Sequence, residues 1–302
     1  MTGRKMLEGK VAIVTGAGGG LGRCHALELA RHGAKVVVND LGEDAAGAVA
    51  QEIREAGGEA IVGVCSVTDE QAVARMVERT IDLWGGVDIL VNNAGILRDK
   101  SFVKMDIADF RTVVDVHLMG AAICTKAVWS PMRERKYGRI VMTTSSSGLY
   151  GNFGQANYGA AKMALVGLMQ TLAIEGAKYD IRVNALAPTA ATQMTGDVLP
   201  EESLERLDPA LVSPGVVHLA SDDAPTRAIL CAGAGHFASA HVTLTDGVQI
   251  GGGADAAAKV ADSWPQIVDR AGEIVPDYGF TQAEREVAAA RSAPKEAFAA
   301  AD

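Results

Sequence analysis

The segment from Lys10 to Asp40 constrains the fold of this chain more than any other stretch. The apolar run KVAIVT (residues 10–15) leads directly into a glycine-rich loop, GAGGGLG (residues 16–22). A helical apolar pattern follows, and a second apolar run then ends at Asp40. Short, continuous apolar runs are typical of parallel strands that are covered on both faces. The segment therefore predicts a strand–helix–strand unit in which the glycine loop opens the helix.

This unit has the chemistry of a dinucleotide site. Glycines allow a tight turn and let backbone N–H groups approach a pyrophosphate, and the start of the helix adds positive potential. An acidic residue about twenty positions further on can accept hydrogen bonds from both ribose hydroxyls. The residues that we expect to hold the cofactor are Gly16, Gly20, Leu21, Gly22 and Asp40. In the alternative interpretation, the glycines serve only tight turns.

The charge of Asp40 also predicts which dinucleotide binds. A carboxylate at this position repels the additional phosphate of NADP. The residue directly before Gly20 is Gly19, and the residue directly after Asp40 is Leu41, so neither position carries a positive charge that would bind this phosphate. We therefore predict NAD as the cofactor.

The same alternation of strands and helices continues through most of the chain. Further strands are expected at residues 59–64, 87–91, 139–144 and 181–186 and near 242–245, with helical patterns between them. Parallel strands linked by helices imply a doubly wound sheet. The predicted fold class is α/β, a single-domain Rossmann-type doubly wound parallel sheet spanning residues 7–250. The composition changes after about Gly253, so residues 254–302 are expected to form a partly helical C-terminal extension.

Composition excludes several other classes of protein. The chain has 302 residues and a formal net charge of −9, which argues against a broad nucleic-acid-binding surface. No run approaches the roughly 18 apolar residues of a membrane span, and the polar N-terminal sequence lacks the apolar core of a signal peptide. The four cysteines are scattered without a Cys-x-x-Cys pair, which favours buried free thiols. We expect a cytoplasmic protein without a metal site.

A second motif lies near the middle of the chain. Ser145 follows a predicted strand, Tyr158 comes thirteen residues later, and Lys162 shares a helix face with Tyr158 because residues four apart are neighbours on a helix. An ammonium close to a phenol favours the phenolate and lowers its pKa. Such a phenol can take a proton from an alcohol or give one to a carbonyl oxygen. A Tyr-x-x-x-Lys pair also occurs by chance on many helices, so the motif gains its weight from the dinucleotide unit upstream.

Together these motifs resemble those of the short-chain dehydrogenase/reductase family. They are Thr15-Gly16-x-x-x-Gly20-x-Gly22, Asn92-Asn93-Ala94-Gly95 and Ser145…Tyr158-x-x-x-Lys162, within residues 7–250. The resemblance implies that Tyr158 is the general acid/base. It implies that Lys162 lowers the pKa of Tyr158 and holds the nicotinamide ribose, and that Ser145 positions the substrate oxygen. Asn93 and Gly95 would line the cofactor cleft.

Longer strings are similar to one subgroup of this family, the (3R)-hydroxyacyl-CoA dehydrogenase regions of peroxisomal multifunctional enzymes type 2, also known as 17β-hydroxysteroid dehydrogenases type 4. The strings are NNAGILRDKSF (92–102), YGRIVMTTSSSGLYGNFGQANY (137–158), LAIEG (172–176) and LPEESLERLDPALVSP (199–214). The resemblance implies NAD-dependent oxidation of a 3-hydroxyacyl-CoA in fatty-acid or sterol side-chain β-oxidation. A 17β-hydroxysteroid or another secondary alcohol is the alternative substrate. A homodimer or homotetramer is also implied.

Three positions depart from the pattern of the wider family. His117 stands where many members have an asparagine that relays protons through water. An imidazole can donate, accept and titrate near neutrality, so His117 is predicted to serve this relay, and a core histidine bonded to a backbone carbonyl is the alternative. Ser66-Val67 replaces an Asp-Val pair that contacts adenine. Pro188-Thr189 replaces Pro-Gly beside the nicotinamide, where Thr189 or Thr192 is expected to contact the amide.

The substrate side is less defined by the sequence. Apolar residues that could line it are Leu149, Tyr150, Phe153 and Met194. Arg98, Lys100 and Lys104 are candidates for a basic rim that holds coenzyme A phosphates, or they form an ordinary solvated face. A 3-oxoacyl reductase is disfavoured by Asp40, because such enzymes usually prefer NADPH. A dinucleotide-binding regulator without turnover would be expected to lose Ser145, Tyr158 or Lys162.

Overall fold

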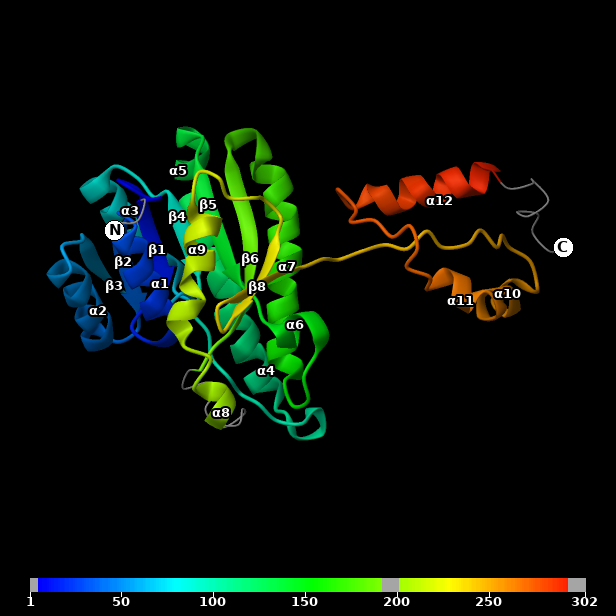
Figure 1. Cartoon of the computed structure of the whole chain (residues 1–302), viewed down its shortest axis with the longest axis horizontal. Helices are drawn as coiled ribbons and strands as arrows, with labels where there is room; N and C mark the ends of the chain where they lie inside the picture. The colour runs from blue at the N-terminus through cyan, green and yellow to red at the C-terminus, as the bar shows by residue number, and fades with distance from the viewer. Residues whose placement is uncertain (1–4, 192–200, 293–302) are drawn as a thin grey trace. The chain divides into compact units, whose positions relative to one another are not determined.

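The computed structural model describes residues 5–191 and 201–292, and in this part of the chain the strands form one sheet of eight (Figure 1). The spatial order is β3-β2-β1-β4-β5-β6-β7-β8, and the first seven strands are parallel. The strands are β1 (Val11–Thr15), β2 (Lys35–Asp40), β3 (Ala60–Val64), β4 (Ile89–Asn92), β5 (Gly138–Thr143), β6 (Ile181–Thr189), β7 (Ile229–Gly233) and β8 (His236–Ala240). This confirms the predicted Rossmann-type class.

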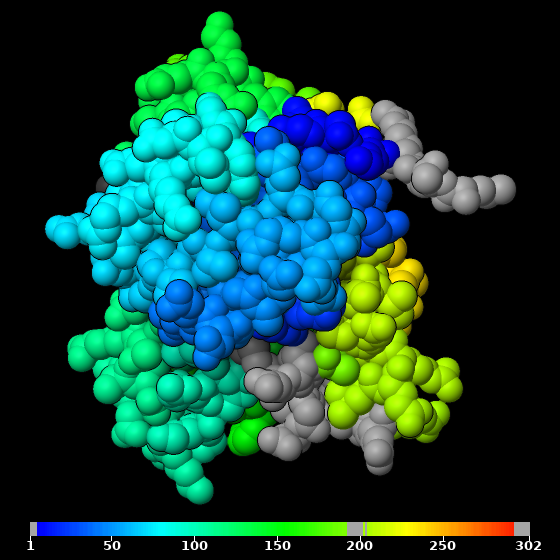
Figure 2. All heavy atoms as spheres, turned by 90° about the vertical axis from the view of Figure 1, so that its left-hand side faces the viewer, coloured from blue at the N-terminus to red at the C-terminus, as the bar shows by residue number. Residues whose placement is uncertain are grey.

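Helices cover both faces of the sheet because side chains alternate along its buried strands. In β1, Ala12 and Val14 belong to one apolar cluster, and Ile13 between them belongs to the other. The first cluster includes α1 (Gly20–Arg31), α2 (Glu43–Glu55) and α9 (Ser213–Ala220), and the second includes α3 (Glu70–Trp84), α5 (Gly120–Arg135) and α7 (Ala156–Gly176). Figure 2 looks onto the side of the sheet that begins with β3, where residues from the first hundred positions form most of the visible surface.

The end of the sheet differs from the prediction. The expected strand near residues 242–245 does not form, and Leu244 makes only an isolated bridge to Ile274. The sheet ends instead with β7 and the antiparallel β8, joined by a two-residue turn at Ala234 and Gly235. Both turn residues have positive φ (51° and 73°), as tight hairpin turns require.

The long central helix is not uniform. It was expected from about Asp106 to Trp129, and it runs as α4 (Ile107–Val114), a π-helical turn η2 (Asp115–Met119) and α5. A π turn inserts an additional residue into a helix and is often found at functional sites. His117 lies in the middle of this turn.

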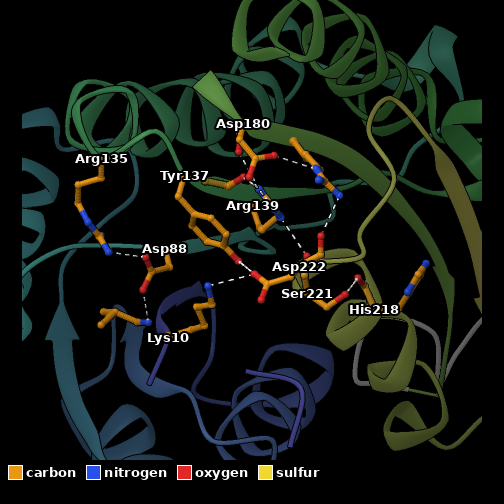
Figure 3. Close-up of polar contacts among 12 residues, drawn as sticks. Lys10, Asp88, Arg135, Tyr137, Arg139, Asp180, His218, Ser221 and Asp222 are labelled. Atoms are coloured by element: carbon orange, nitrogen blue, oxygen red, sulfur yellow. Dashed lines mark hydrogen bonds and ion pairs between the residues drawn. The ribbon is translucent and has the colours of Figure 1, made fainter. Parts of the chain in front are cut away.

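A polar network joins the amino ends of five strands, opposite to the edge where the loops described below lie (Figure 3). Arg139, 1% exposed, donates to the backbone oxygens of Ser221 (2.9 Å) and Asp180 (2.7 Å). Its guanidinium lies 4.2 Å from the ring centroid of Tyr137, whose hydroxyl donates to Asp222 (2.8 Å). These contacts fix the loops before β5, β6 and β7 to one another.

The chain separates into two compact units, residues 1–240 and 241–302. The second unit contains α10 (Ala256–Asp262), α11 (Trp264–Ile267) and α12 (Phe280–Ser292). None of its described residues is buried. The first compact unit ends at Ala240, before the predicted boundary at residue 253. The division of the chain into a domain and an extension stays a prediction.

Candidate active site

The loops at the carboxyl edge of the sheet enclose a cavity of about 630 Å³. Strand order reverses between β1 and β4, and ligands of open α/β sheets bind in the crevice at such a reversal. The predicted residues that line this one cavity are Gly16, Gly20, Leu21, Gly22, Asp40, Ser66, Val67, Asn93, Gly95, His117, Ser145, Tyr158, Lys162, Pro188 and Thr189. Thr192 and Met194 lie outside the described residues.

Two loop glycines are required by close backbone approaches. A Cβ atom on Gly22 would lie 2.1 Å from the carbonyl oxygen of Gly16, and one on Gly16, where φ is +62°, would lie 2.8 Å from Cα of Ala94. Gly19 has open space around it and caps α1 without a side-chain hydrogen bond. The first N–H groups of α1 are thus left for a ligand, which fits a pyrophosphate at this point.

Asp40 is held in place at the end of β2. Its Oδ2 accepts from the N–H of Gly18 (2.9 Å), and its Oδ1 accepts from the N–H of Leu41 (2.8 Å). The carboxylate therefore lies beside the glycine loop, where the ribose of a dinucleotide fits. Among the described residues that line the cavity, Lys162 is the only lysine or arginine.

Asn93 ties the loop after β4 to the glycine loop. Its Nδ2 donates to the carbonyl oxygens of Thr15 (3.0 Å) and Gly16 (3.2 Å). The hydroxyl of Thr15 in turn accepts from the N–H groups of Asn93 and Ala94, both at 3.0 Å. These bonds shape the floor of the cavity. They also hold Nδ2 of Asn93 so close to Gly22 that a Cβ atom on Gly22 would lie only 2.6 Å from it.

Lys162 is buried beneath the cavity, with 3% of its surface exposed. Its Nζ donates to the carbonyl oxygen of Thr143 at the end of β5 (2.6 Å) and lies 5.4 Å from the ring centroid of Tyr158. Burial lowers the pKa of Lys162 to about 7. The ammonium is therefore only partly charged at neutral pH.

The pKa of Tyr158 differs from the expectation. Burial of the phenol raises its pKa, a hydrogen bond with the Ser145 side chain lowers it, and the charge of Asp99 raises it further. The predicted lowering of the pKa by Lys162 is not found. Desolvation disfavours the phenolate more strongly than a lysine whose own charge is reduced by burial can favour it.

His117 packs edge-on against Tyr158, with ring centroids 5.2 Å apart. Its Nε2 contacts the backbone of Ile96, 2.8 Å from the oxygen and 3.0 Å from the nitrogen. Burial and the nearby Lys162 lower the pKa of His117 to about 3, so it does not titrate near neutrality as free imidazole does. Its backbone contact matches the core-histidine alternative, and a relay through it would use neutral hydrogen bonding only.

The residues expected on the substrate side are not gathered in the cavity. Tyr150 and Phe153 are exposed (72% and 90%), and neither lines the cavity. Of the proposed basic rim, Lys100 is engaged by Asp106 and Asp109 through contacts of 3.1 and 3.0 Å.

Two amide side chains in the cavity wall were missed from the sequence. Asn152 and Gln155 both line the cavity, and Nδ2 of Asn152 donates to Oε1 of Gln155 (3.1 Å). Gln155 comes three residues before Tyr158, one helical turn away. That spacing was the available signal.

The Rossmann-type sheet with Ser145, Tyr158 and Lys162 at its carboxyl edge defines the class of Rossmann-fold oxidoreductases. Residues 10–203 match the short chain dehydrogenase family. The chain belongs to the short-chain dehydrogenase/reductase family, as the motifs indicated, and is an oxidoreductase.

Several relatives are similar over much of the chain. A Mycobacterium tuberculosis protein named as a short-chain type dehydrogenase/reductase is 46% identical over 88% of this chain and 96% of its own length. Peroxisomal multifunctional enzyme A of Dictyostelium discoideum is 47% identical over 85% of this chain, and peroxisomal multifunctional enzyme type 2 of Drosophila melanogaster is 51% identical over 72%. The matched regions span only 60% and 37% of those two enzymes.

Solved structures agree with the sequence matches. The full-length multifunctional enzyme type 2 of Drosophila melanogaster superposes with a TM-score of 0.78 at 39% identity, covering 93% of this chain and 49% of that one. A 7α-hydroxysteroid dehydrogenase in complex with NADH and 7-oxo glycochenodeoxycholic acid superposes with a TM-score of 0.71 at 32% identity, covering 77% of this chain and 96% of that one.

Proposed function

We propose that this protein is an NAD-dependent dehydrogenase that oxidises the 3-hydroxyl group of a (3R)-hydroxyacyl-CoA in fatty-acid or sterol side-chain β-oxidation. The observation that carries the proposal is the meeting of Ser145, Tyr158 and Lys162 in one cavity with the glycine loop and Asp40. Sequence identity of 47% and 51% to two multifunctional enzymes over the matched regions supports the choice of substrate class.

In the proposed reaction, the alcohol loses a hydride from its carbon and a proton from its oxygen. Bound NAD would supply the acceptor for the hydride of the carbinol carbon and would leave as NADH. Tyr158 takes the hydroxyl proton, and Ser145 hydrogen-bonds the same substrate oxygen, so the alcohol becomes a ketone. Lys162, anchored to the carbonyl oxygen of Thr143, would hold the nicotinamide ribose and would favour the phenolate whenever it is charged.

The choice of NAD rests on Asp40. Its carboxylate lies beside the glycine loop, where it would accept hydrogen bonds from the ribose hydroxyls, and no arginine or lysine near it among the described lining residues would neutralise an additional phosphate. We propose further that Ser66 and Val67 contact the adenine and that Asn93 and Gly95 line the cofactor cleft. Pro188, Thr189 and Thr192 are proposed to contact the nicotinamide amide.

A second candidate function is hydroxysteroid dehydrogenase, which the similarity to the bile-acid-binding 7α-hydroxysteroid dehydrogenase favours. The two functions are separated by NADH formation at 340 nm with NAD and, in parallel, a (3R)-hydroxyacyl-CoA, its (3S) isomer and hydroxysteroids. We expect turnover of the (3R) thioester. Turnover of a steroid alone would replace the first proposal by the second, and faster turnover with NADP would contradict the cofactor proposal.

We also propose that the protein is a homodimer or homotetramer. The second unit has no buried described residue, and its exposed apolar side chains are Val242, Val248, Val260, Trp264, Val268, Val275, Tyr278, Phe280 and Val287. Packing against further copies of the chain would remove these apolar side chains from water. Light scattering should give two or four times the mass of the 31.3 kDa chain, and a monomeric mass would contradict the proposal.

A further inference from the structure

The segment that follows Gly95 runs along the start of α7, and three hydrogen bonds hold it there. Nδ2 of Asn157, a fully buried residue, donates to the carbonyl oxygen of Arg98 (3.0 Å). The N–H of Lys100 donates to the carbonyl oxygen of Gly154 (2.9 Å). Asp99, between these two anchored residues, is thereby fixed next to the first turn of the helix that carries Tyr158.

The carboxylate of Asp99 makes the third bond. Nε2 of Gln155 donates to Oδ2 of Asp99 at 2.6 Å. A carboxylate can only accept hydrogen bonds, so it determines which end of the amide faces it. Oε1 of Gln155 must then face Asn152, whose Nδ2 donates to it. Since Gln155 is 8% exposed and lines the cavity, Asp99 sets the polarity of part of the cavity wall.

The same carboxylate belongs to the charged surroundings of Tyr158. On α7 itself, Lys162 places its Nζ 5.4 Å from the ring. From η2, His117 presents a neutral imidazole, and from the start of α6 (Ser146–Tyr150), Ser145 supplies a hydrogen bond. Asp99 contributes the negative charge from the loop after β4, and this charge raises the pKa of Tyr158.

Building on the proposed role of Tyr158, we propose that Asp99 is a positioning residue of the active site: its carboxylate holds the Gln155 amide in one orientation at the cavity wall and places a negative charge at the first turn of the helix that carries Tyr158. Through this charge, Asp99 contributes to the pH range in which Tyr158 changes from a proton donor to a proton acceptor. The orientation of Gln155 is a separate effect, which acts on substrate binding.

Two substitutions separate the two effects. Asp99→Asn removes the charge but keeps an oxygen that can accept from Gln155, whereas Asp99→Leu removes both. Asp106→Asn is the matched control, because it removes a nearby exposed carboxylate that pairs with Lys100 and makes no contact with Gln155. Thermal unfolding of each variant verifies that it is folded.

The first measurement is the pH dependence of kcat/KM for alcohol oxidation. Loss of the negative charge makes the phenol easier to ionise, so the acid limb of the Asp99→Asn profile should move to lower pH while KM changes less than about twofold. Asp99→Leu should show the same shift with kcat/KM lowered about tenfold, as expected for loss of a hydrogen bond to a charged group. The Asp106→Asn profile should coincide with that of the wild type. An unshifted Asp99→Asn profile, or an equal shift in the control, would overturn the proposal.

A second measurement does not depend on the substrate. The phenolate absorbs near 295 nm, so the difference between each protein and its Tyr158→Phe derivative isolates the titration of Tyr158. The midpoint should be lower in Asp99→Asn than in the wild type, and equal midpoints would refute the role of Asp99 even if no substrate were turned over. Full activity of Tyr158→Phe would instead contradict the proposed function.

Discussion

At the scale of single residues, burial decides the chemistry of the candidate site. The Tyr158–Lys162 spacing predicts that the two side chains are neighbours, and the structure places them so. The spacing does not reveal that Lys162 is buried and Tyr158 largely removed from water, which lowers the pKa of the lysine to about 7 and raises that of the phenol. Spacing is a property of one helix, whereas burial is produced by elements far apart in the sequence.

Gly22 illustrates a residue whose role is steric. Gly22→Ala would place Cβ 2.1 Å from the Gly16 carbonyl oxygen, so the free energy of unfolding should fall by ~1–3 kcal/mol. Gly47→Ala is the control, because Gly47 also lies within a helix but has open space around it. That variant should gain up to ~1 kcal/mol. Urea unfolding measures both, and equal effects would contradict the steric explanation.

Asp40 should set cofactor preference through its charge. Asp40→Asn keeps an oxygen for the N–H of Gly18 and removes the repulsion of a ribose phosphate. We expect the ratio of kcat/KM for NADP to that for NAD to rise about tenfold or more, since unit charges at contact interact by at least ~1 kcal/mol. Steady-state kinetics with both cofactors provide the measurement, and an unchanged ratio would place the discrimination elsewhere.

At the scale of elements, the first six strands were predictable because each is an apolar run bounded by turn residues. The β7–β8 hairpin was not. Its first strand is a short run among alanines and glycines, and four of the five residues of β8 are exposed, so no alternating pattern marks it. Pairing with β6, more than forty residues earlier, stabilises β7 instead. The π turn at His117 was hidden for a similar reason, because an inserted residue leaves the apolar pattern of a helix largely intact.

Arg139 should contribute strongly to the stability of the strands that it joins. Arg139→Met leaves the buried backbone oxygen of Ser221 and the partly buried one of Asp180 without this donor, and the free energy of unfolding should fall by ~3 kcal/mol. Arg133→Met, at an exposed position, should change it by less than ~0.5 kcal/mol. Below its unfolding transition the Arg139 variant should keep its activity, because the network lies opposite to the cavity. A loss of activity without a loss of stability would contradict this assignment.

At the scale of the whole molecule, the family, the fold class and the oxidoreductase class follow from the chain, whereas the substrate, the oligomer and the cytoplasmic location stay predictions. Among the described residues, no helix has both the length and the hydrophobicity needed to cross a bilayer. The second unit illustrates the limit of sequence reasoning. Its helical composition is recognisable in the sequence, but the sequence does not predict what its exposed apolar side chains contact.

Stability should depend on pH through two buried histidines. Burial lowers the pKa of His25 and of His117 to about 3, against about 6.5 in an unfolded chain. The unfolded state therefore binds more protons between pH 6.5 and 3, and stability falls as the pH is lowered through this window, by up to ~1.4 kcal/mol per pH unit for each histidine. His25→Gln should reduce this slope by about half in urea unfolding at several pH values. An unchanged slope would show that His25 is not the source.

The central claim is that Tyr158 exchanges the proton while the rest of the site binds the cofactor. The most direct measurement compares the wild type with Tyr158→Phe in two assays, NADH formation from a (3R)-hydroxyacyl-CoA and binding of NADH by fluorescence. We predict that kcat falls about a thousandfold or more, because a general acid/base is lost, while the Kd for NADH changes less than about threefold. A Tyr158→Phe protein that still forms NADH at the rate of the wild type would contradict the account.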